Sequence, residues 1–169
     1  MASDDEFLKH FNENFSESGD LPDEEMEARR RRELNEKEVK VLGVYEAAKG
    51  AFILLRDGRG RAMPIFIGHP EAVSISLAME SHATPRPLTH DLVRILLDRL
   101  GAQVESVLVD DLYNNTYYAK LSLTANSKAI DIDCRPSDAI AIALRSKAPI
   151  YVADAVLEEA QVEWREQES

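Results

Sequence analysis

The chain is poor in cysteine and has no long hydrophobic run. Cys134 stands alone, so the sequence excludes an internal disulfide and a cysteine-based zinc site. A single thiol is typical of proteins of the reducing cytoplasm. No apolar stretch approaches the ~18 residues that a membrane-spanning helix needs, and the N-terminus lacks the apolar region of a signal peptide. We therefore expect a cytoplasmic protein without a membrane partner.

A surplus of positive charge is also absent, since the 169 residues carry a net charge of -11. Such a charge argues against non-specific binding of nucleic acid by the chain as a whole. Residues 1–38 hold 13 acidic and 6 basic residues, residues 39–160 hold 15 and 13, and residues 161–169 hold 3 and 1. The sequence thus predicts an acidic, disordered or helical N-terminal segment over 1–38, a domain over 39–160 and an acidic tail over 161–169.

The most informative stretch that is present covers residues 128–147, which pass from a strand to a helix. Apolar and acidic residues alternate over 130–133, the period-2 pattern of a strand with one solvated face. Residues 139–144 are almost wholly apolar, which predicts a buried helix. Pro136 has a fixed φ and no N–H, so it fits the first helical turn. The start of that helix is electropositive and can bind an anion.

Patterning over the rest of the domain alternates short strands with short helices. The same reasoning predicts strands over 39–47, 51–56, 61–67, 103–112, 116–124, 128–134 and 150–152, and helices over 68–81, 89–100, 136–144 and 154–161. In the helix over 89–100, Thr89 is a good N-cap and Gly101 follows the end. Its buried stripe is expected to consist of Leu92, Val93, Leu96, Leu97 and Leu100.

An internal repeat relates the two halves of the domain at a gapless offset of 67 residues. Arg61-Ala62-Met63 corresponds to Lys128-Ala129-Ile130, and Glu71-Ala72-Val73 corresponds to Asp138-Ala139-Ile140. Any two βββα units would look somewhat alike, but the shared acidic-alanine helix start and the gapless register favour duplication. We predict an α+β fold of duplicated βββα units with antiparallel sheets, an inserted helix between the halves, and a short C-terminal strand and helix.

Polar side chains beyond the needs of a core gather around residues 86–91, 110–118 and 131–138. Each group has a structural explanation. A carboxylate in a first helical turn is stabilised by about 0.3–1 kcal/mol without any function, and nearby arginines could simply pair with it. The sequence contains no P-loop, dinucleotide fingerprint, zinc signature or serine triad. Taken one at a time, these motifs identify no chemistry.

The combination of motifs is more specific. Arg86-Pro-Leu-Thr-His-Asp-Leu92, Asp133-Cys-Arg-Pro-Ser-Asp-Ala-Ile-Ala141 and Pro149-Ile-Tyr-Val152 together resemble the bifunctional nuclease domain family of bacteria and plants. Thr116-Tyr-Tyr-Ala119 and Pro64-Ile-Phe-Ile-Gly68 fit the same pattern, so the resemblance covers residues 39–160. It implies a compact α+β homo-oligomer that hydrolyses RNA and DNA.

Phosphodiester hydrolysis needs an activated water and compensation for charge on the phosphate oxygens, which divalent metals on clustered carboxylates often supply. We expect Mg²⁺ or Mn²⁺ to bind at Asp110, Asp111, Asp131 and Asp133. The phosphate would be held by Arg86, Arg135 and Ser137. The catalytic group would consist of Asp133, Asp138, His90 and Asp91, with His90 as general acid or base.

A second interpretation stays open: a non-catalytic, oligomeric binding or scaffold domain whose Arg–Asp motifs are structural. The core has no basic surplus and few signals of exposed aromatic residues for stacking, so affinity for nucleic acid should be modest. Convergence of the motifs on an open cleft would favour the enzyme. Complete burial, with Arg86 and Arg135 saturated by aspartates, would favour the scaffold.

Overall fold

One seven-stranded sheet organises the part of the chain that the computed structural model describes, residues 33–48 and 50–164. The strands are β1 (Lys37–Ala47), β2 (Gly50–Asp57), β3 (Ala62–Ile67), β4 (Ala102–Tyr113), β5 (Thr116–Ala125), β6 (Lys128–Cys134) and β7 (Ile150–Val152). The helices are α3 (His69–Met79), α4 (Thr89–Arg99), α5 (Pro136–Ser146) and α6 (Asp154–Ala160). The predicted α+β class is confirmed. Most of the predicted acidic N-terminal segment and the end of the tail lie outside the described residues.

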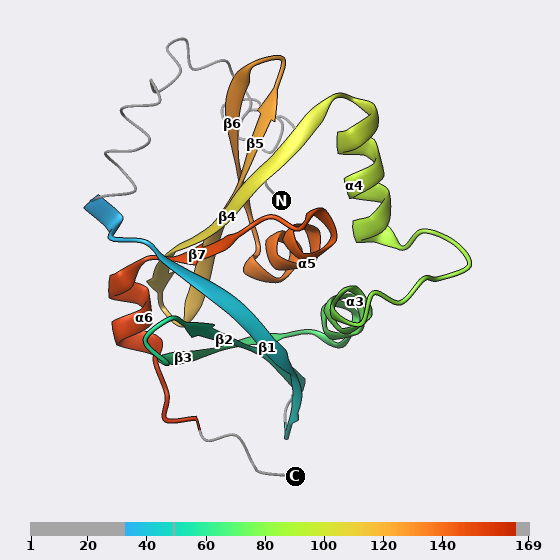
Figure 1. Cartoon of the computed structure of the whole chain (residues 1–169). Helices are drawn as coiled ribbons and strands as arrows, with labels where there is room; N and C mark the ends of the chain where they lie inside the picture. Colours follow the sequence, from blue (N-terminus) through green and yellow to red (C-terminus); the bar gives the residue numbers. More distant parts are fainter. Residues whose placement is uncertain (1–32, 49, 165–169) are drawn as a thin grey trace, which may run out of the picture.

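The strand order is β3-β2-β1-β7-β4-β5-β6, so the two predicted halves flank β7 (Figure 1). Every neighbouring pair is antiparallel except β4 and β7. Each half is an antiparallel meander followed by a helix, and α4 comes between them in the sequence. The edge position of β3 agrees with its internal Pro64, because proline has no N–H to donate to a neighbouring strand. Duplication itself remains a prediction, which superposition of residues 39–82 on 106–149 would test.

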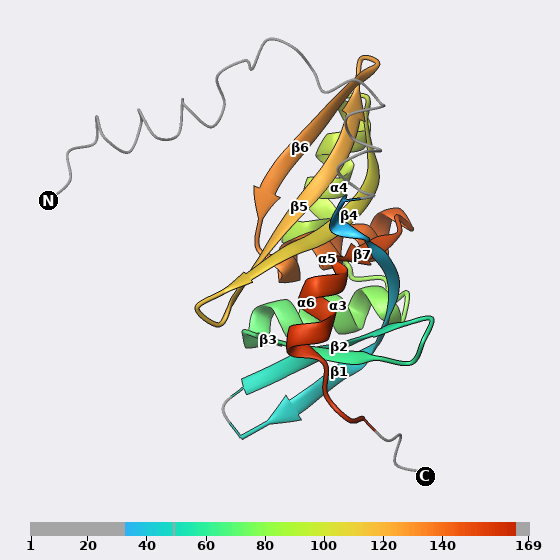
Figure 2. The same ribbon diagram turned by 90° about the vertical axis from the view of Figure 1, so that its left-hand side faces the viewer.

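The sheet is strongly curled and encloses the core between its halves. The Tyr117 hydroxyl of β5 donates to the Pro64 carbonyl of β3 at 3.2 Å. Four strands, β2, β1, β7 and β4, separate β3 from β5 in the sheet order, so the sheet must bend for these two strands to meet. Helices α3 and α5 close one side of this core, and α6 closes the other by contacting both β3 and β4 (Figures 1 and 2). The most completely buried large side chains are Ile53, Leu54, Leu55, Met63, Ile75, Ile140 and Leu157.

Helix α5 is buried along most of its length, as its apolar run predicts. Its alanines allow close approach of α3, α4 and the strands β4 and β5. Pro136 occupies the first turn, and Arg135 before it is extended (φ -67, ψ 141), as expected for a residue that precedes proline. Among the described helices, none is long and apolar enough to cross a membrane.

The predicted orientation of α4 is wrong. Leu92 and Leu96 are each 50% exposed and Leu100 is 75% exposed, whereas Val93 and Leu97 pack against the core. The helix begins one residue earlier than predicted, with Leu88 as N-cap and Thr89 as its first residue. The Leu88 N–H donates to the Asp91 carboxylate at 2.9 Å. Polar contacts from the first turn of α4 to α3 and α5, described below, decide which apolar face turns inward.

Lys147 ends α5 in the left-handed conformation, with φ 55 and ψ 32. Glycine is preferred at such a position because it has no Cβ to clash with the backbone. We predict that Lys147→Gly raises the free energy of unfolding by about 0.5–1 kcal/mol, measured by urea denaturation. Lys147→Ala is the control, because alanine keeps the Cβ; equal effects of the two substitutions would contradict the prediction.

Candidate functional site

The first turns of α3, α4 and α5 meet in one polar cluster. Arg135 precedes α5, and its Nε donates to Asp138 Oδ2 at 2.7 Å while Nη2 donates to Asp138 Oδ1 and to Glu71 Oε1, both at 3.0 Å. His90 of α4 reaches the same carboxylate, with Nε2 at 3.1 Å from Asp138 Oδ1. The structure therefore brings His90, Arg135 and Asp138 together, as the sequence predicts, and adds Glu71.

His90 is held from both sides of its ring. Its Nδ1 lies 2.8 Å from the Oγ of Ser74, a buried residue of α3, and its side chain is only 13% exposed. If Nε2 carries the proton that it shares with Asp138, Nδ1 accepts the hydroxyl hydrogen of Ser74. This chain of serine, histidine and aspartate fixes the ring and links three helices. Ser74 escaped the sequence analysis because nothing in an apolar helical stretch distinguishes a serine that bonds a distant histidine.

Asp138 stays ionised in this cluster. Burial raises its pKa, but hydrogen bonds and charge from Arg135 and from His90 outweigh burial and hold the pKa below its usual range. A carboxylate with a lowered pKa is a weak base, but it is fully ionised at neutral pH. Asp138 therefore acts mainly as a fixed negative charge that orients the two cationic or hydrogen-bonding side chains around it.

Arg135 presents one free edge to solvent. Its side chain is 65% exposed although two carboxylates hold Nε and Nη2. Within the described ranges, Nη1 has no protein partner. The guanidinium is thus fixed in direction by one edge and open to an anion at the other, beside the electropositive start of α5.

A second ion pair lies deeper between the same helices. Arg145 of α5 is 7% exposed; its Nε donates to Asp91 Oδ1 at 2.6 Å, Nη1 to the Ala141 carbonyl and Nη2 to the Ser74 carbonyl. Asp91 also accepts the Leu88 N–H at 2.9 Å. Burial raises the pKa of Asp91, but Arg145 and the Leu88 N–H outweigh burial and lower it. This arrangement is structural, since it ties α4 to α5 and α3.

The other predicted phosphate ligands are placed less favourably. Arg86 lies in the exposed loop before α4, and Asp91 pairs with Arg145 instead of with it. Ser137 is in the first turn of α5 but is only 7% exposed. Arg145 could have been suspected from the sequence, because a charged residue next to a wholly apolar helical run needs a buried partner.

The four predicted metal ligands do not come together. Asp110 pairs with Lys120 at 3.0 Å, Asp131 accepts the Ser122 hydroxyl at 2.7 Å, and Asp133 lies opposite Lys120 in the register of β5 and β6. Asp111 is exposed and accepts the N–H of its own neighbour. In the described part of the chain, no three histidine, cysteine, aspartate or glutamate side chains are placed to bind one metal ion. The donor set as arranged does not fit a divalent cation.

Cys134, at the end of β6, is not a nucleophile at neutral pH. Burial, and then the negative charge of Asp133, raise the pKa of its thiol to about 11. The side chain is half-buried, and Sγ lies 3.8 Å from the Ala119 carbonyl of β5. Because the thiolate is the reactive form, covalent catalysis through this cysteine is not supported.

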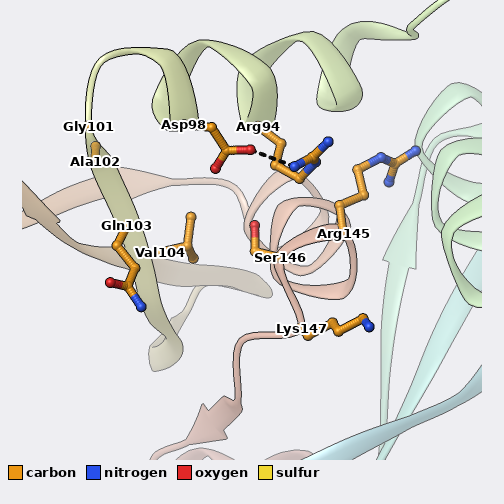
Figure 3. Close-up of a pocket in the computed structure, with 9 residues that line it drawn as sticks. All are labelled: Arg94, Asp98, Gly101, Ala102, Gln103, Val104, Arg145, Ser146 and Lys147. Atoms are coloured by element: carbon orange, nitrogen blue, oxygen red, sulfur yellow. Dashed lines mark hydrogen bonds and ion pairs between the residues drawn. The ribbon is translucent and has the colours of Figure 1, made fainter.

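A pocket of about 360 Å³ opens farther along α4 and α5, between the end of each helix and the start of β4 (Figure 3). The pocket is lined by three basic residues, Arg94, Lys147 and the buried Arg145. Arg94 is paired with Asp98 at 2.6 Å. The Ser146 Oγ is buried there and has no hydrogen-bond partner among the described residues. About two helical turns of α5, roughly 12 Å, separate this pocket from Asp138. Its lining offers charges of both signs, so it identifies no particular ligand.

Comparison with known proteins adds a family to this geometry. The model of the bifunctional nuclease domain matches residues 53–165. An uncharacterized protein of Mycobacterium tuberculosis is 44% identical over 126 residues, which cover 73% of this chain and 75% of that protein. Bifunctional nuclease 1 of Oryza sativa is 30% identical over 118 residues and bifunctional nuclease 2 of Arabidopsis thaliana is 34% identical over 111. The matched segments make up 36% and 34% of those plant proteins.

Proposed function

Because the chain belongs to the bifunctional nuclease domain family, we propose that it hydrolyses phosphodiester bonds in RNA, in DNA or in both. The names of the plant relatives support this activity. The main structural support for the proposal is Arg135. Asp138 and Glu71 hold its guanidinium in place where three helices meet, and one edge of the guanidinium is exposed to solvent.

In this proposal Arg135 binds a non-bridging phosphate oxygen through its free Nη1 edge, and the start of α5 adds positive potential. Glu71 is a positioning residue for Arg135. Asp138 is the fixed negative charge that holds Arg135 and His90 beside the bound phosphate, and His90 is the proposed general acid or base. Asp133, two residues before Arg135, supplies a further exposed carboxylate. Asp91 contributes only indirectly, because its pair with Arg145 holds α4, and with it His90, against α5.

Whether hydrolysis requires Mg²⁺ or Mn²⁺ is a separate question for experiment. The predicted carboxylates do not form a three-ligand group in the described ranges, so no step proposed here passes through a cation. Rates measured with each cation and with a chelator establish whether one is required.

The test uses the purified full chain and fluorescent single-stranded 20-mers of RNA and of DNA. We expect the wild type to cleave at least one of them, and Asp138→Asn, purified in parallel, to be slower by about 100-fold or more. Equal cleavage by both samples would remove Asp138 from the proposed site. No cleavage by a folded wild type under any cation condition would overturn the proposal.

One observation favours the scaffold alternative. Both ring nitrogens of His90 and both oxygens of Asp138 already have protein partners, so the cluster is satisfied without a substrate. Under that alternative the cluster serves to attach α4 to the rest of the fold. It predicts that Asp138→Asn lowers stability while the wild type shows no hydrolysis, an outcome that the same samples distinguish.

We also propose that the chain forms a homo-oligomer through the exposed side of α4. Leu88, Leu92, Leu96 and Leu100 recur every four residues and are 37 to 75% exposed. Ridges formed by residues four apart can interdigitate with the same ridge of a second copy. We predict that Leu96→Glu lowers the molar mass measured by light scattering to that of a monomer, 19.0 kDa.

The control for this measurement is Val73→Glu, which places the same charge at a similarly exposed apolar position on α3 (43%). It should leave the molar mass unchanged. A wild type that is monomeric at every concentration would contradict the assignment of this surface.

A further inference from the structure

Three aromatic rings form a row across β1, β2 and β3. Tyr45 lies directly opposite Phe52 in the register of β1 and β2, and Phe52 lies opposite Phe66 in that of β2 and β3. The ring centroids of Tyr45 and Phe52 are 5.5 Å apart and those of Phe52 and Phe66 are 5.7 Å apart. Phe66, on the edge strand, is 70% exposed. The sequence alone does not indicate this row, because its members lie far apart along the chain.

The row faces away from the core. Ile53 and Leu55 point into the core from β2, so Phe52 and Leu54, which alternate with them, lie on the opposite face of the sheet; Leu54 is fully buried there, whereas Phe52 is only partly buried. An aromatic side chain left 70% exposed on this face is not explained by core packing. Contiguous exposed aromatic surface is typical of a binding site.

Trp164 extends the row. The segment after α6 passes in front of β1–β3 (Figure 2), and its Val162 N–H donates to the Ala62 carbonyl at 2.8 Å. The Trp164 ring then packs 4.9 Å from Tyr45 and 6.2 Å from Phe52, and the side chain remains 36% exposed. The four rings therefore make one continuous surface, of which Phe66 is the most open part.

Gly43 is part of the construction of this surface. A Cβ at Gly43 would lie 3.1 Å from the Tyr45 ring, closer than ordinary packing allows. A side chain at position 43 would therefore displace the Tyr45 ring. The β-bulge between Val41 and Gly43 shifts the register by one residue, which places Tyr45 opposite Phe52.

The same face carries positive charge. Arg56 is four residues beyond Phe52 in β2, hence on the same side of the strand and roughly 13 Å away. Lys40 of β1 lies directly opposite Arg56. Glu163, next to Trp164, and Glu38, two residues before Lys40 on the same side of β1, add negative charge to this face, so its affinity for an anion should be moderate.

We propose that the outer face of β1–β3 is a binding surface for single-stranded nucleic acid, with bases stacked on Phe66 and Phe52 and phosphate groups at Lys40 and Arg56. The choice of nucleic acid over another aromatic or anionic ligand rests on the nuclease function proposed above. A single strand is specified because its bases are free to stack on side chains, whereas those of a duplex are already stacked on each other. The surface lies apart from Arg135 and would hold a long substrate rather than react with it.

Binding is measured by fluorescence anisotropy with a labelled single-stranded DNA 12-mer whose linkages are phosphorothioate, in the presence of a chelator. Phe66→Ala should weaken binding about 5- to 100-fold, the usual loss when one stacked base loses its platform, and Phe66→Trp should retain it. Lys40→Ala should reduce the slope of log K against log salt by about 0.7, corresponding to one phosphate contact. Quenching of Trp164 fluorescence on titration gives an independent signal from the surface itself.

The matched control is Val73→Ala, an exposed apolar truncation on α3, which should bind as the wild type does. Phe66 is largely exposed, so its variants should fold, and a thermal melt verifies this. Binding by Phe66→Ala equal to that of the wild type, or no binding by a folded wild type, overturns the proposed surface. If the wild type binds with the expected sensitivity to Phe66→Ala and cleaves nothing, the surface stands and the nuclease proposal fails.

Discussion

Replacement of Arg145 by methionine is expected to lower the free energy of unfolding by about 3 kcal/mol, the lower end of the usual cost of removing one partner of a buried ion pair, because the Asp91 side chain that loses its partner is 30% exposed. The Arg145 side chain is almost inaccessible to solvent, and its guanidinium donates hydrogen bonds to Asp91 and to the carbonyls of Ala141 and Ser74. Methionine fills a similar volume, so the loss measures the polar contacts rather than a cavity. Urea denaturation followed by circular dichroism gives the value.

The control is Arg94→Met on α4. Arg94 also pairs with an aspartate, Asp98, at 2.6 Å, but the side chains are 37% and 57% exposed. An exposed pair contributes about 0–1 kcal/mol. If Arg145→Met costs no more than Arg94→Met, the attachment of α4 does not depend on the buried pair and the assignment of Arg145 is wrong.

The pH dependence of the Arg145 effect follows from the lowered pKa of Asp91. A carboxylate whose folded pKa lies below its unfolded pKa contributes stability above the unfolded value, 3.8, and loses it as the pH falls through the folded pKa. The difference between the wild type and Arg145→Met should thus be constant near neutral pH and shrink below about pH 4.

The second large effect concerns activity. Arg135→Ala should lower kcat/KM for the 20-mer substrates by about 100- to 1000-fold, the range seen when a fixed donor to a developing charge is removed. Stability should change little, by about 1 kcal/mol or less, because the Arg135 side chain is 65% exposed. Steady-state cleavage rates and urea denaturation of the same samples separate the two quantities.

Two controls accompany this variant. Arg135→Lys keeps the charge but not the planar fork that reaches Asp138, Glu71 and the phosphate together, so it should restore only part of the rate. Arg99→Ala removes an exposed arginine at the far end of α4 and should cleave as the wild type does. Unchanged cleavage by Arg135→Ala would remove Arg135 from the proposed site and favour the structural role of the cluster.

The sequence by itself determined the secondary structure and the α+β class. Pro136 marked the start of α5, because that signal arises within a few residues of backbone. The alternation over 130–133 correctly predicted the strand β6 but wrongly predicted a buried face for it, since Ile130 and Ile132 on this edge strand are 43% and 36% exposed. The motifs at the starts of α4 and α5 also indicated that His90 and Asp138 belong together, and the structure places them 3.1 Å apart.

Only the tertiary structure decided which partners meet. Both faces of α4 carry leucine, so periodicity could not choose between them; the contacts of His90 with Ser74 and Asp138, and of Asp91 with Arg145, made the choice. Lys120 occupies the place beside Asp110 where a metal was expected. The aromatic row likewise exists only through the register of three strands and a bulge. Local patterns specify the direction in which a side chain points, but long-range contacts depend on how distant segments pack, which no local pattern contains.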